Sequence, residues 1–165
     1  MSNLGIPADY GRLRGLPRHA EATKLVSLGP NADGRDIRVT PEAAVAWGQL
    51  RAAAAVAGIT LVAVSGFRSI ARQAEIIQAK LDRGDKMDAI LQVMAAPGFS
   101  EHHTGRAIDI TVPGEMPLVE EFTLTPAFAW LEAHAAEFGF RLSYPRDNPY
   151  GIAYEPWHWY FIGPA

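Results

Sequence analysis

The sequence predicts a single domain of mixed α and β structure. Three observations lead to this expectation: several helices have clear start and stop signals, short runs of good β-formers lie between them, and the last two runs have no helix between them. Alternating strands and helices are compatible with a parallel sheet, whereas the final pair favours antiparallel pairing. At 165 residues, the chain has the length of one domain.

The first part of the chain leads to a well-marked helix. Residues 1–34 are rich in Gly, Pro, Asn and Asp, and we expect them to form an irregular lead-in. A short strand is predicted over residues 35–39. Thr40 then stands at a helix N-cap with Pro41 at the first helical position, and Gly58 is a plausible stop.

The remaining elements are predicted from the same signals. Ser69 and Thr125 are N-cap residues, and Gly84 and Gly139 follow the corresponding helices. The expected strands are residues 61–64, 106–111, 140–144 and 157–162, and the expected helices are residues 69–83, 85–95 and 125–138.

The composition narrows the possible functions. Fifteen basic and eighteen acidic residues give a net charge of -3, which disfavours nucleic acid as the main partner. The chain has no cysteine, which excludes disulfide frameworks, thiolate metal sites and cysteine nucleophiles. No run approaches the roughly 20 apolar residues that span a bilayer, and the first residues do not read as a signal peptide.

A metal site in this chain must therefore use His, Asp and Glu, and residues 100–109 carry the first candidates. Gly105 permits a bend that could bring a loop histidine and a strand aspartate onto one ion. Asp109 lies between two isoleucines of a predicted strand, so we expect its carboxylate to be partly buried and to need a partner. The other interpretation is a salt bridge between Asp109 and Arg106, with the histidines on the surface.

Residues 155–159 supply a third candidate ligand and a possible base. His158 could complete a zinc site, and Glu155 could take the proton of a water molecule there. Strand alternation places Trp157 and Trp159 on one face and His158 on the other. The alternative is an aromatic strand with an incidental histidine.

Arg68 is the third element of interest. It follows a predicted strand and directly precedes a helix cap. An arginine there can bind a carboxylate through two N–H groups or polarise a carbonyl. The commoner case for a single arginine is a solvated surface position.

Taken together, three motifs resemble the VanY-type D-alanyl-D-alanine metallo-carboxypeptidases, within the lysostaphin, D-Ala-D-Ala peptidase and hedgehog-like zinc domains. Residues 65–69 are similar to S-G-[YF]-R-S, residues 100–109 match S-x-H-x-x-G-x-A-x-D at every fixed position, and residues 155–159 match E-P-W-H-W. The resemblance covers about residues 39–163. It departs at Tyr160, where the family often has arginine.

The resemblance implies an α+β fold, a small antiparallel sheet flanked by helices, with residues 35–165 as one zinc peptidase domain. It implies that His102, Asp109 and His158 bind Zn2+ and that Glu155 is the general base. Strand alternation alone would place His103, rather than His102, beside Asp109, but the family pattern selects His102.

The resemblance also implies a substrate and its contacts. Arg68 would hold the scissile carbonyl or the terminal carboxylate, and Ser100 and Gln73 would be further substrate contacts. The implied activity is zinc-dependent D-alanyl-D-alanine carboxypeptidase, acting on peptidoglycan stem peptides through metal-activated water. The alternatives are an L,D-endopeptidase, a D,D-dipeptidase, or a non-catalytic zinc-containing binding module. We expect a monomer. The family implies a site outside the cytoplasm, although the sequence shows no export signal.

Overall fold

The structure is a computed structural model that describes residues 4–163. Five α-helices and six strands are present in this part of the chain, and none of its helices is long and apolar enough to cross a membrane. The helices are α1 (Tyr10–Arg14), α2 (Pro41–Val56), α3 (Ile70–Asp82), α4 (Met87–Val93) and α5 (Pro126–His134). The strands are β1 (Val26–Pro30), β2 (Asp36–Val39), β3 (Val62–Ser65), β4 (Ala107–Thr111), β5 (Phe140–Leu142) and β6 (His158–Phe161).

The strands form two small antiparallel sheets. Strands β1 and β2 pair with each other, and the larger sheet has the order β3-β4-β6-β5. Every neighbouring pair in the larger sheet is antiparallel, so the parallel arrangement does not occur there. The expected α+β fold with a small antiparallel sheet flanked by helices is confirmed.

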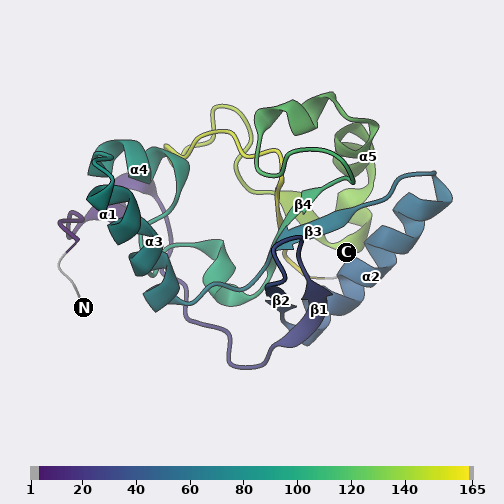
Figure 1. Ribbon diagram of the computed structural model, residues 1–165, viewed down its shortest axis with the longest axis horizontal. Coiled ribbons are helices and arrows are strands. Elements are labelled where there is room, and N and C mark those ends of the chain that lie inside the picture. Colours follow the sequence, from purple (N-terminus) through teal and green to yellow (C-terminus); the bar gives the residue numbers. More distant parts are fainter. Residues whose placement is uncertain (1–3, 164–165) are drawn as a thin grey trace.

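The helices lie on two sides of this sheet. Figure 1 shows α1, α3 and α4 gathered on one side of the molecule and α2 and α5 on the other, with the strands between them. The main hydrophobic core joins α2, α5 and one face of the larger sheet, through residues that include Trp47, Leu50, Ile108, Leu131 and Trp159. A smaller core around α1 and α4 includes Tyr10, Leu91 and Tyr144.

Three helices begin as the sequence predicts. The side chains of Thr40, Ser69 and Thr125 each accept a hydrogen bond from the backbone N–H three residues further on. The helix expected over residues 125–138 is α-helical only to His134, because a 3-10 turn, η3 (Ala135–Phe138), completes it before Gly139.

The expectation of an irregular lead-in over residues 1–34 is wrong for its described part. The segment contains α1 and β1, and β1 pairs with β2 in a register that shifts between Ser27 and Gly29. Gly and Pro are tolerated in a two-stranded, irregular pair, which is why composition concealed the strand. The lead-in also contacts the predicted site, since the N–H groups of His19 and Ala22 donate to the carbonyls of Gly98 and His103.

Residue 105 must be glycine because the lead-in packs closely against it. Its φ is 64°, and a Cβ there would lie 2.8 Å from Leu25 Cδ2. We predict that Gly105→Ala lowers the free energy of unfolding by about 2–4 kcal/mol, from backbone strain and crowding together. Gly114→Ala is the matched control, because Gly114 also has positive φ but no atom within 4 Å of its Cβ position. Urea denaturation should give a loss of about 1 kcal/mol for the control; equal losses would contradict the crowding argument.

Candidate active site

A short turn brings His102 to Asp109. The turn is a 3-10 helix, η1 (Glu101–Thr104), capped by Ser100, whose hydroxyl accepts from the His102 N–H. Gly105 ends it in the left-handed conformation, and β4 begins two residues later. As a result, His102 Nε2 lies 3.3 Å from Asp109 Oδ2. The predicted bend at Gly105 therefore has the expected consequence.

The pairing of β4 with β6 brings His158 to the same carboxylate. Asp109 and His158 are direct cross-strand partners, and so are their neighbours Ile108 and Trp159. Directly opposed residues share one face of a sheet. Ile108 and Trp159 face the main core, whereas His158 Nδ1 lies 3.1 Å from Asp109 Oδ1.

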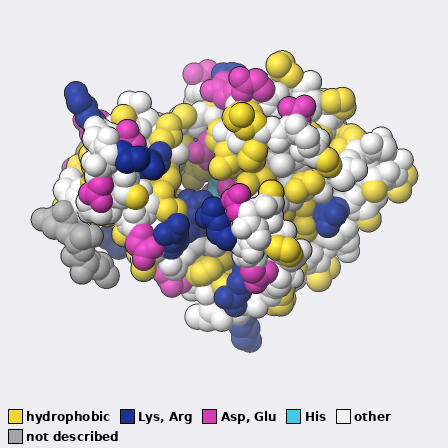
Figure 2. Space-filling model, viewed as in Figure 1, with side chains coloured by type: hydrophobic (Ala, Val, Ile, Leu, Met, Phe, Trp, Pro, Cys, Tyr) yellow, Lys and Arg dark blue, Asp and Glu magenta, His cyan; other side chains and the backbone are white. Residues whose placement is uncertain are grey.

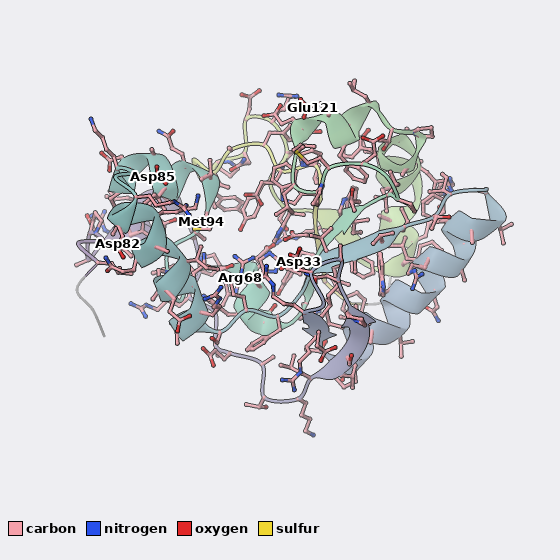
Figure 3. The ribbon with its side chains drawn as sticks, viewed as in Figure 1. Asp33, Arg68, Asp82, Asp85, Met94 and Glu121 are labelled. Atoms are coloured by element: carbon pink, nitrogen blue, oxygen red, sulfur yellow. The ribbon has the colours of Figure 1, made fainter. Side chains whose placement is uncertain are left out.

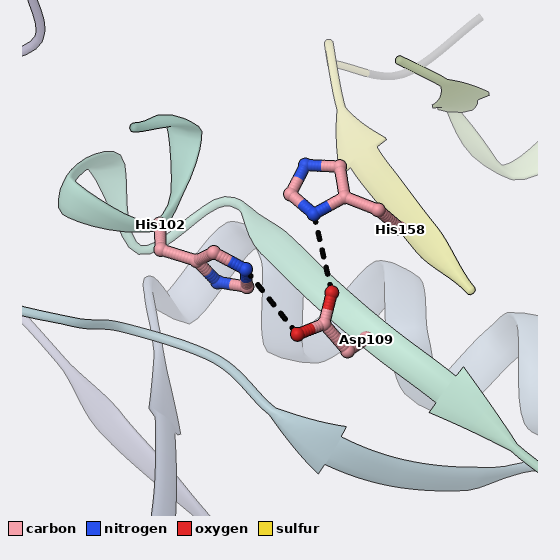
Figure 4. A group of neighbouring side chains, drawn as sticks. All are labelled: His102, Asp109 and His158. Atoms are coloured by element: carbon pink, nitrogen blue, oxygen red, sulfur yellow. Dashed lines mark hydrogen bonds and ion pairs between the residues drawn. The ribbon is translucent and has the colours of Figure 1, made fainter. Parts of the chain in front are cut away.

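His102, Asp109 and His158 form one buried cluster (Figure 4). One ligand atom from each lies within 4.8 Å of the others, in the only such group of three or more among residues 4–163. Two imidazoles and a carboxylate are a three-ligand set used by catalytic zinc sites, which leave a further position open. The residues present therefore fit a zinc ion.

Each imidazole is oriented by a contact outside the cluster. His102 Nδ1 donates to the carbonyl of Gly66 at 2.6 Å, which leaves Nε2 facing Asp109. His158 Nε2 contacts Glu101 Oε2 at 2.9 Å, which leaves Nδ1 facing Asp109. Such contacts fix which ring nitrogen is available to a metal ion.

His103 is not part of the cluster, although strand alternation would have placed it there. It is fully buried, and its two ring nitrogens bond to the N–H of Gly98 and the carbonyl of Arg68. The η1 turn interrupts the two-residue period between His103 and Asp109, so the alternation argument does not apply.

The cluster changes the pKa values of its own groups. Burial opposes ionisation of Asp109, yet the facing His102 and His158 outweigh it and hold the pKa of Asp109 well below its usual range. Burial acts to lower the pKa of His158, but its hydrogen bonds to Asp109 and Glu101 raise that pKa to about 10. For His102, burial dominates over Asp109 and lowers the pKa.

Glu155 stands beside this cluster. It lies in the turn before β6, and its Oε2 is 3.8 Å from His158 Nδ1. The backbone fixes the turn, since the Glu155 carbonyl accepts from the His158 N–H and the Glu155 N–H donates to Tyr144. Burial raises the pKa of Glu155 to about 7, against the opposing charge of His158. The carboxylate thus has the pKa of a proton acceptor near neutral pH.

Arg68 is held at the cavity by an amide side chain. Its Nη1 donates to Gln73 Oε1 at 2.9 Å, and the almost fully buried Gln73 donates in turn to the Ala95 carbonyl at 2.7 Å. Figure 3 shows Arg68 near the middle of the molecule and Met94 at the end of α4. Gln73 therefore orients Arg68, while Ser100 caps η1; both also line the cavity.

All the predicted site residues line one cavity of about 310 Å³. Its polar side chains include Arg68, Gln73, Ser100, His102, Asp109, Tyr144, Glu155 and His158, and its apolar wall includes Val93, Met94, Leu118, Ile152 and Trp157. In the space-filling view the surface is hollowed near its centre, with Lys and Arg side chains below the hollow (Figure 2). Convergent polar groups within apolar walls are typical of a site for a small substrate.

Glu101 is a residue that the sequence analysis missed. It lies inside the second motif, and its carboxylate contacts His158, Arg141 and Ser143. No local pattern indicates those partners, since each is at least 40 positions away. Its only signal was its place between the two motif residues Ser100 and His102.

Comparison with known proteins identifies the family. The model of the VanY family, described as D-alanyl-D-alanine carboxypeptidase, matches residues 36–164. The chain belongs to this family. It is 35% identical to the putative carboxypeptidase YodJ of Bacillus subtilis (strain 168) over 157 residues, which cover 90% of this chain and 56% of that relative. The chain thus spans little more than half of that relative's length.

Solved structures of VanY-type and related peptidases have the same fold. The LdcB LD-carboxypeptidase superposes with a TM-score of 0.78 at 32% identity, over 89% of this chain and 72% of that one. A VanY D,D-pentapeptidase E175A mutant in complex with Zn(II) superposes with a TM-score of 0.67 at 28% identity, over 96% and 83%. The zinc in that VanY neighbour agrees with the donor set of the His102, Asp109 and His158 cluster.

We predict that His158 remains protonated well above its ordinary pKa once metal is removed by a chelator. Folding raises the pKa of His158 to about 10, because protonated His158 faces the carboxylates of Asp109 and Glu101. These ion pairs therefore stabilise the fold fully below pH ~6.5, the ordinary pKa of histidine. This stabilisation is then lost as the pH rises through about 10. NMR titration of the imidazole, with urea denaturation at pH 7 and 10, measures both effects. A midpoint near 6.5 would contradict the prediction.

Proposed function

We propose that this protein is a zinc-dependent peptidase that removes the terminal D-alanine of peptidoglycan stem peptides. The observation that carries the proposal is the His102, Asp109 and His158 cluster at one cavity with Glu155 and Arg68. Membership of the VanY family and the Zn(II) complex of a neighbour support it. Because these peptides belong to the cell wall, we also infer a site of action outside the cytoplasm.

In this proposal, His102 Nε2, His158 Nδ1 and a carboxylate oxygen of Asp109 would hold the zinc ion. The ion would supply Lewis-acid chemistry, which polarises a carbonyl and activates water near neutral pH. All three ligands, and all the other groups invoked, come from one chain. A monomer is therefore sufficient for the reaction.

Glu155 acts as the general base and then as the general acid. Its carboxylate faces the cluster in a largely buried setting, where it accepts a proton from the attacking water. It then delivers that proton to the leaving amine as the peptide bond breaks. A non-catalytic zinc module would have no need of a carboxylate in this place.

Arg68 binds the oxygen atoms of the substrate. Its guanidinium lines the cavity and is held by Gln73, so its remaining N–H groups can donate to the scissile carbonyl or to the terminal carboxylate. Ser100 and Gln73 serve the substrate mainly through the groups that they orient, His102 and Arg68.

A second candidate is release of D-alanine from a tetrapeptide, in which the residue before D-alanine is an L-centre. The observation that favours it is the TM-score of 0.78 with the LdcB LD-carboxypeptidase, against 0.67 with the VanY structure. Both candidates use the same metal cluster and the same base. They differ in the residue that precedes the terminal D-alanine of the substrate and that the apolar wall of the cavity would contact. This residue is D-alanine in the first candidate and an L-centre in the second.

The choice of metal ligand is tested by two neighbouring histidines. His102→Ala should lose stoichiometric zinc after dialysis, because a three-ligand site would keep only two ligands. His103→Ala is the matched control and should retain zinc, although loss of its two buried hydrogen bonds should lower stability by about 1–3 kcal/mol. Elemental analysis of both purified variants gives the answer; zinc retained in His102→Ala would overturn the assignment.

The activity is tested by the products released from three substrates. We expect the zinc-loaded protein to release D-alanine from a stem pentapeptide or a stem tetrapeptide, faster than it cleaves free D-Ala-D-Ala. Glu155→Gln should bind zinc normally and lose about 10²–10⁴-fold in kcat/KM, since the amide cannot accept a proton. Amino acid analysis follows the release. Turnover near that of wild type in Glu155→Gln would contradict the proposed base, and no release from either peptide would contradict the proposed function.

A further inference from the structure

Glu101 holds a buried carboxylate directly behind the histidine cluster. Its side chain is 9% exposed, and its two oxygens contact three groups. Oε2 lies 2.9 Å from His158 Nε2 and accepts from Ser143 Oγ at 2.5 Å, while Oε1 accepts from Arg141 Nη2 at 2.9 Å. The hydrogen bonds of this carboxylate therefore reach two other parts of the fold, the end of β5 and the start of β6.

The contact with Glu101 determines which nitrogen of His158 is left to face the other residues of the cluster. A neutral imidazole carries one N–H and one acceptor nitrogen. Without a metal ion, protonated His158 can donate from Nδ1 to Asp109 and from Nε2 to Glu101. With a metal ion on Nδ1, the one N–H of the neutral ring would lie on Nε2, toward the Glu101 carboxylate, which can only accept. Nδ1, which faces Asp109 and His102, is then the nitrogen that would bind the metal ion.

We infer that Glu101 is the positioning residue of the metal centre, which fixes the tautomer and the ring orientation of His158. The inference rests on the proposed zinc site and extends it by one residue. Carboxylates that accept from the second nitrogen of a metal-binding histidine raise its basicity and restrain its ring. Glu101 acts through His158 and does not touch the substrate.

Glu101 is itself positioned by strand β5 and the residues after it. Arg141 belongs to β5, where it is the cross-strand partner of Tyr160 of β6. The Arg141 guanidinium lies 5.4 Å from the centre of the Tyr160 ring, an arrangement that favours a fixed cation. Tyr160, the position at which the chain departs from the family motif, thus supports the arginine that pairs with Glu101.

These contacts connect three segments behind the site. Glu101 lies in η1 beside His102, Arg141 and Ser143 lie in or just after β5, and His158 begins β6. The positive charge of Arg141 offsets the cost of a buried carboxylate, so Glu101 need not be protonated to be buried. The backbone of η1 and the imidazole of His158 are thereby held in one arrangement.

The experiment measures zinc affinity in Glu101 variants by competition with a chromophoric chelator. Glu101→Ala should raise the Kd for zinc by about 10–100-fold, because His158 loses the partner of its Nε2–H. Glu101→Gln keeps an oxygen acceptor without the charge and should raise the Kd by less than tenfold. The matched control is Glu137→Ala, which removes the exposed glutamate paired with His134 at 2.9 Å and should leave the Kd unchanged.

A second readout separates positioning from a merely structural role. Cobalt replaces zinc in such sites and has a visible absorption spectrum that depends on ligand geometry. Glu101→Ala should alter this spectrum, and Glu101→Gln should restore most of it. A variant that is only less stable would show the wild-type spectrum and the wild-type Kd in its folded fraction.

The outcomes for this inference and for the proposed function are distinct. If the wild-type protein does not bind zinc, the proposed function fails. If the wild type binds zinc and Glu101→Ala matches its Kd and its cobalt spectrum, the positioning role is overturned and the zinc site stands. Should Glu101→Ala fail to fold, Glu101→Met, which fills similar space without an oxygen acceptor, takes its place, and a wild-type Kd and cobalt spectrum in that variant contradict the inference.

Discussion

The buried carboxylate of Asp109 between two imidazoles is the interaction on which the rest of the structure depends. An ionised carboxylate without partners would cost several kcal/mol in the interior of a protein. His102 and His158 meet Asp109 from two sides, and all three residues are at most 5% exposed. The partners come from different segments, so the η1 turn and the β4–β6 pairing must both be in place for the cluster to form.

A layer of hydrogen bonds surrounds this interaction. The carbonyl of Gly66 orients His102, the carboxylate of Glu101 orients His158, and Gln73 orients Arg68. Among the described residues, Thr111 Oγ1 is the only buried side-chain polar atom without a partner. A polar network that is satisfied in this way favours one arrangement over others, because any displacement leaves a buried group unpaired. The geometry of the site therefore depends on these surrounding hydrogen bonds as much as on the three metal-binding side chains.

The two hydrophobic cores explain where the cavity lies. The main core fixes the sheet through α2 and α5, while the smaller core holds α1, α4 and the segment around Tyr144. The cavity takes His158 and Asp109 from the sheet, and part of its apolar wall, including Met94 and Ile152, from the side of the smaller core. This division gives the polar groups a rigid base and gives the substrate an apolar surface to contact.

The sequence by itself determined the features that depend on neighbouring residues: the capped starts of three helices, the bend at Gly105, and the motifs that contain His102, Asp109 and His158. Short-range hydrogen bonds and backbone preferences set these features, so they can be recognised in the chain. Only the tertiary structure decided that β1 pairs in the lead-in and that Glu101 meets His158. The family motif had selected His102 over His103, and the η1 turn gives the physical reason why His102 meets Asp109. These outcomes depend on which distant segments share a sheet face or a turn, and that is fixed by packing of the whole domain.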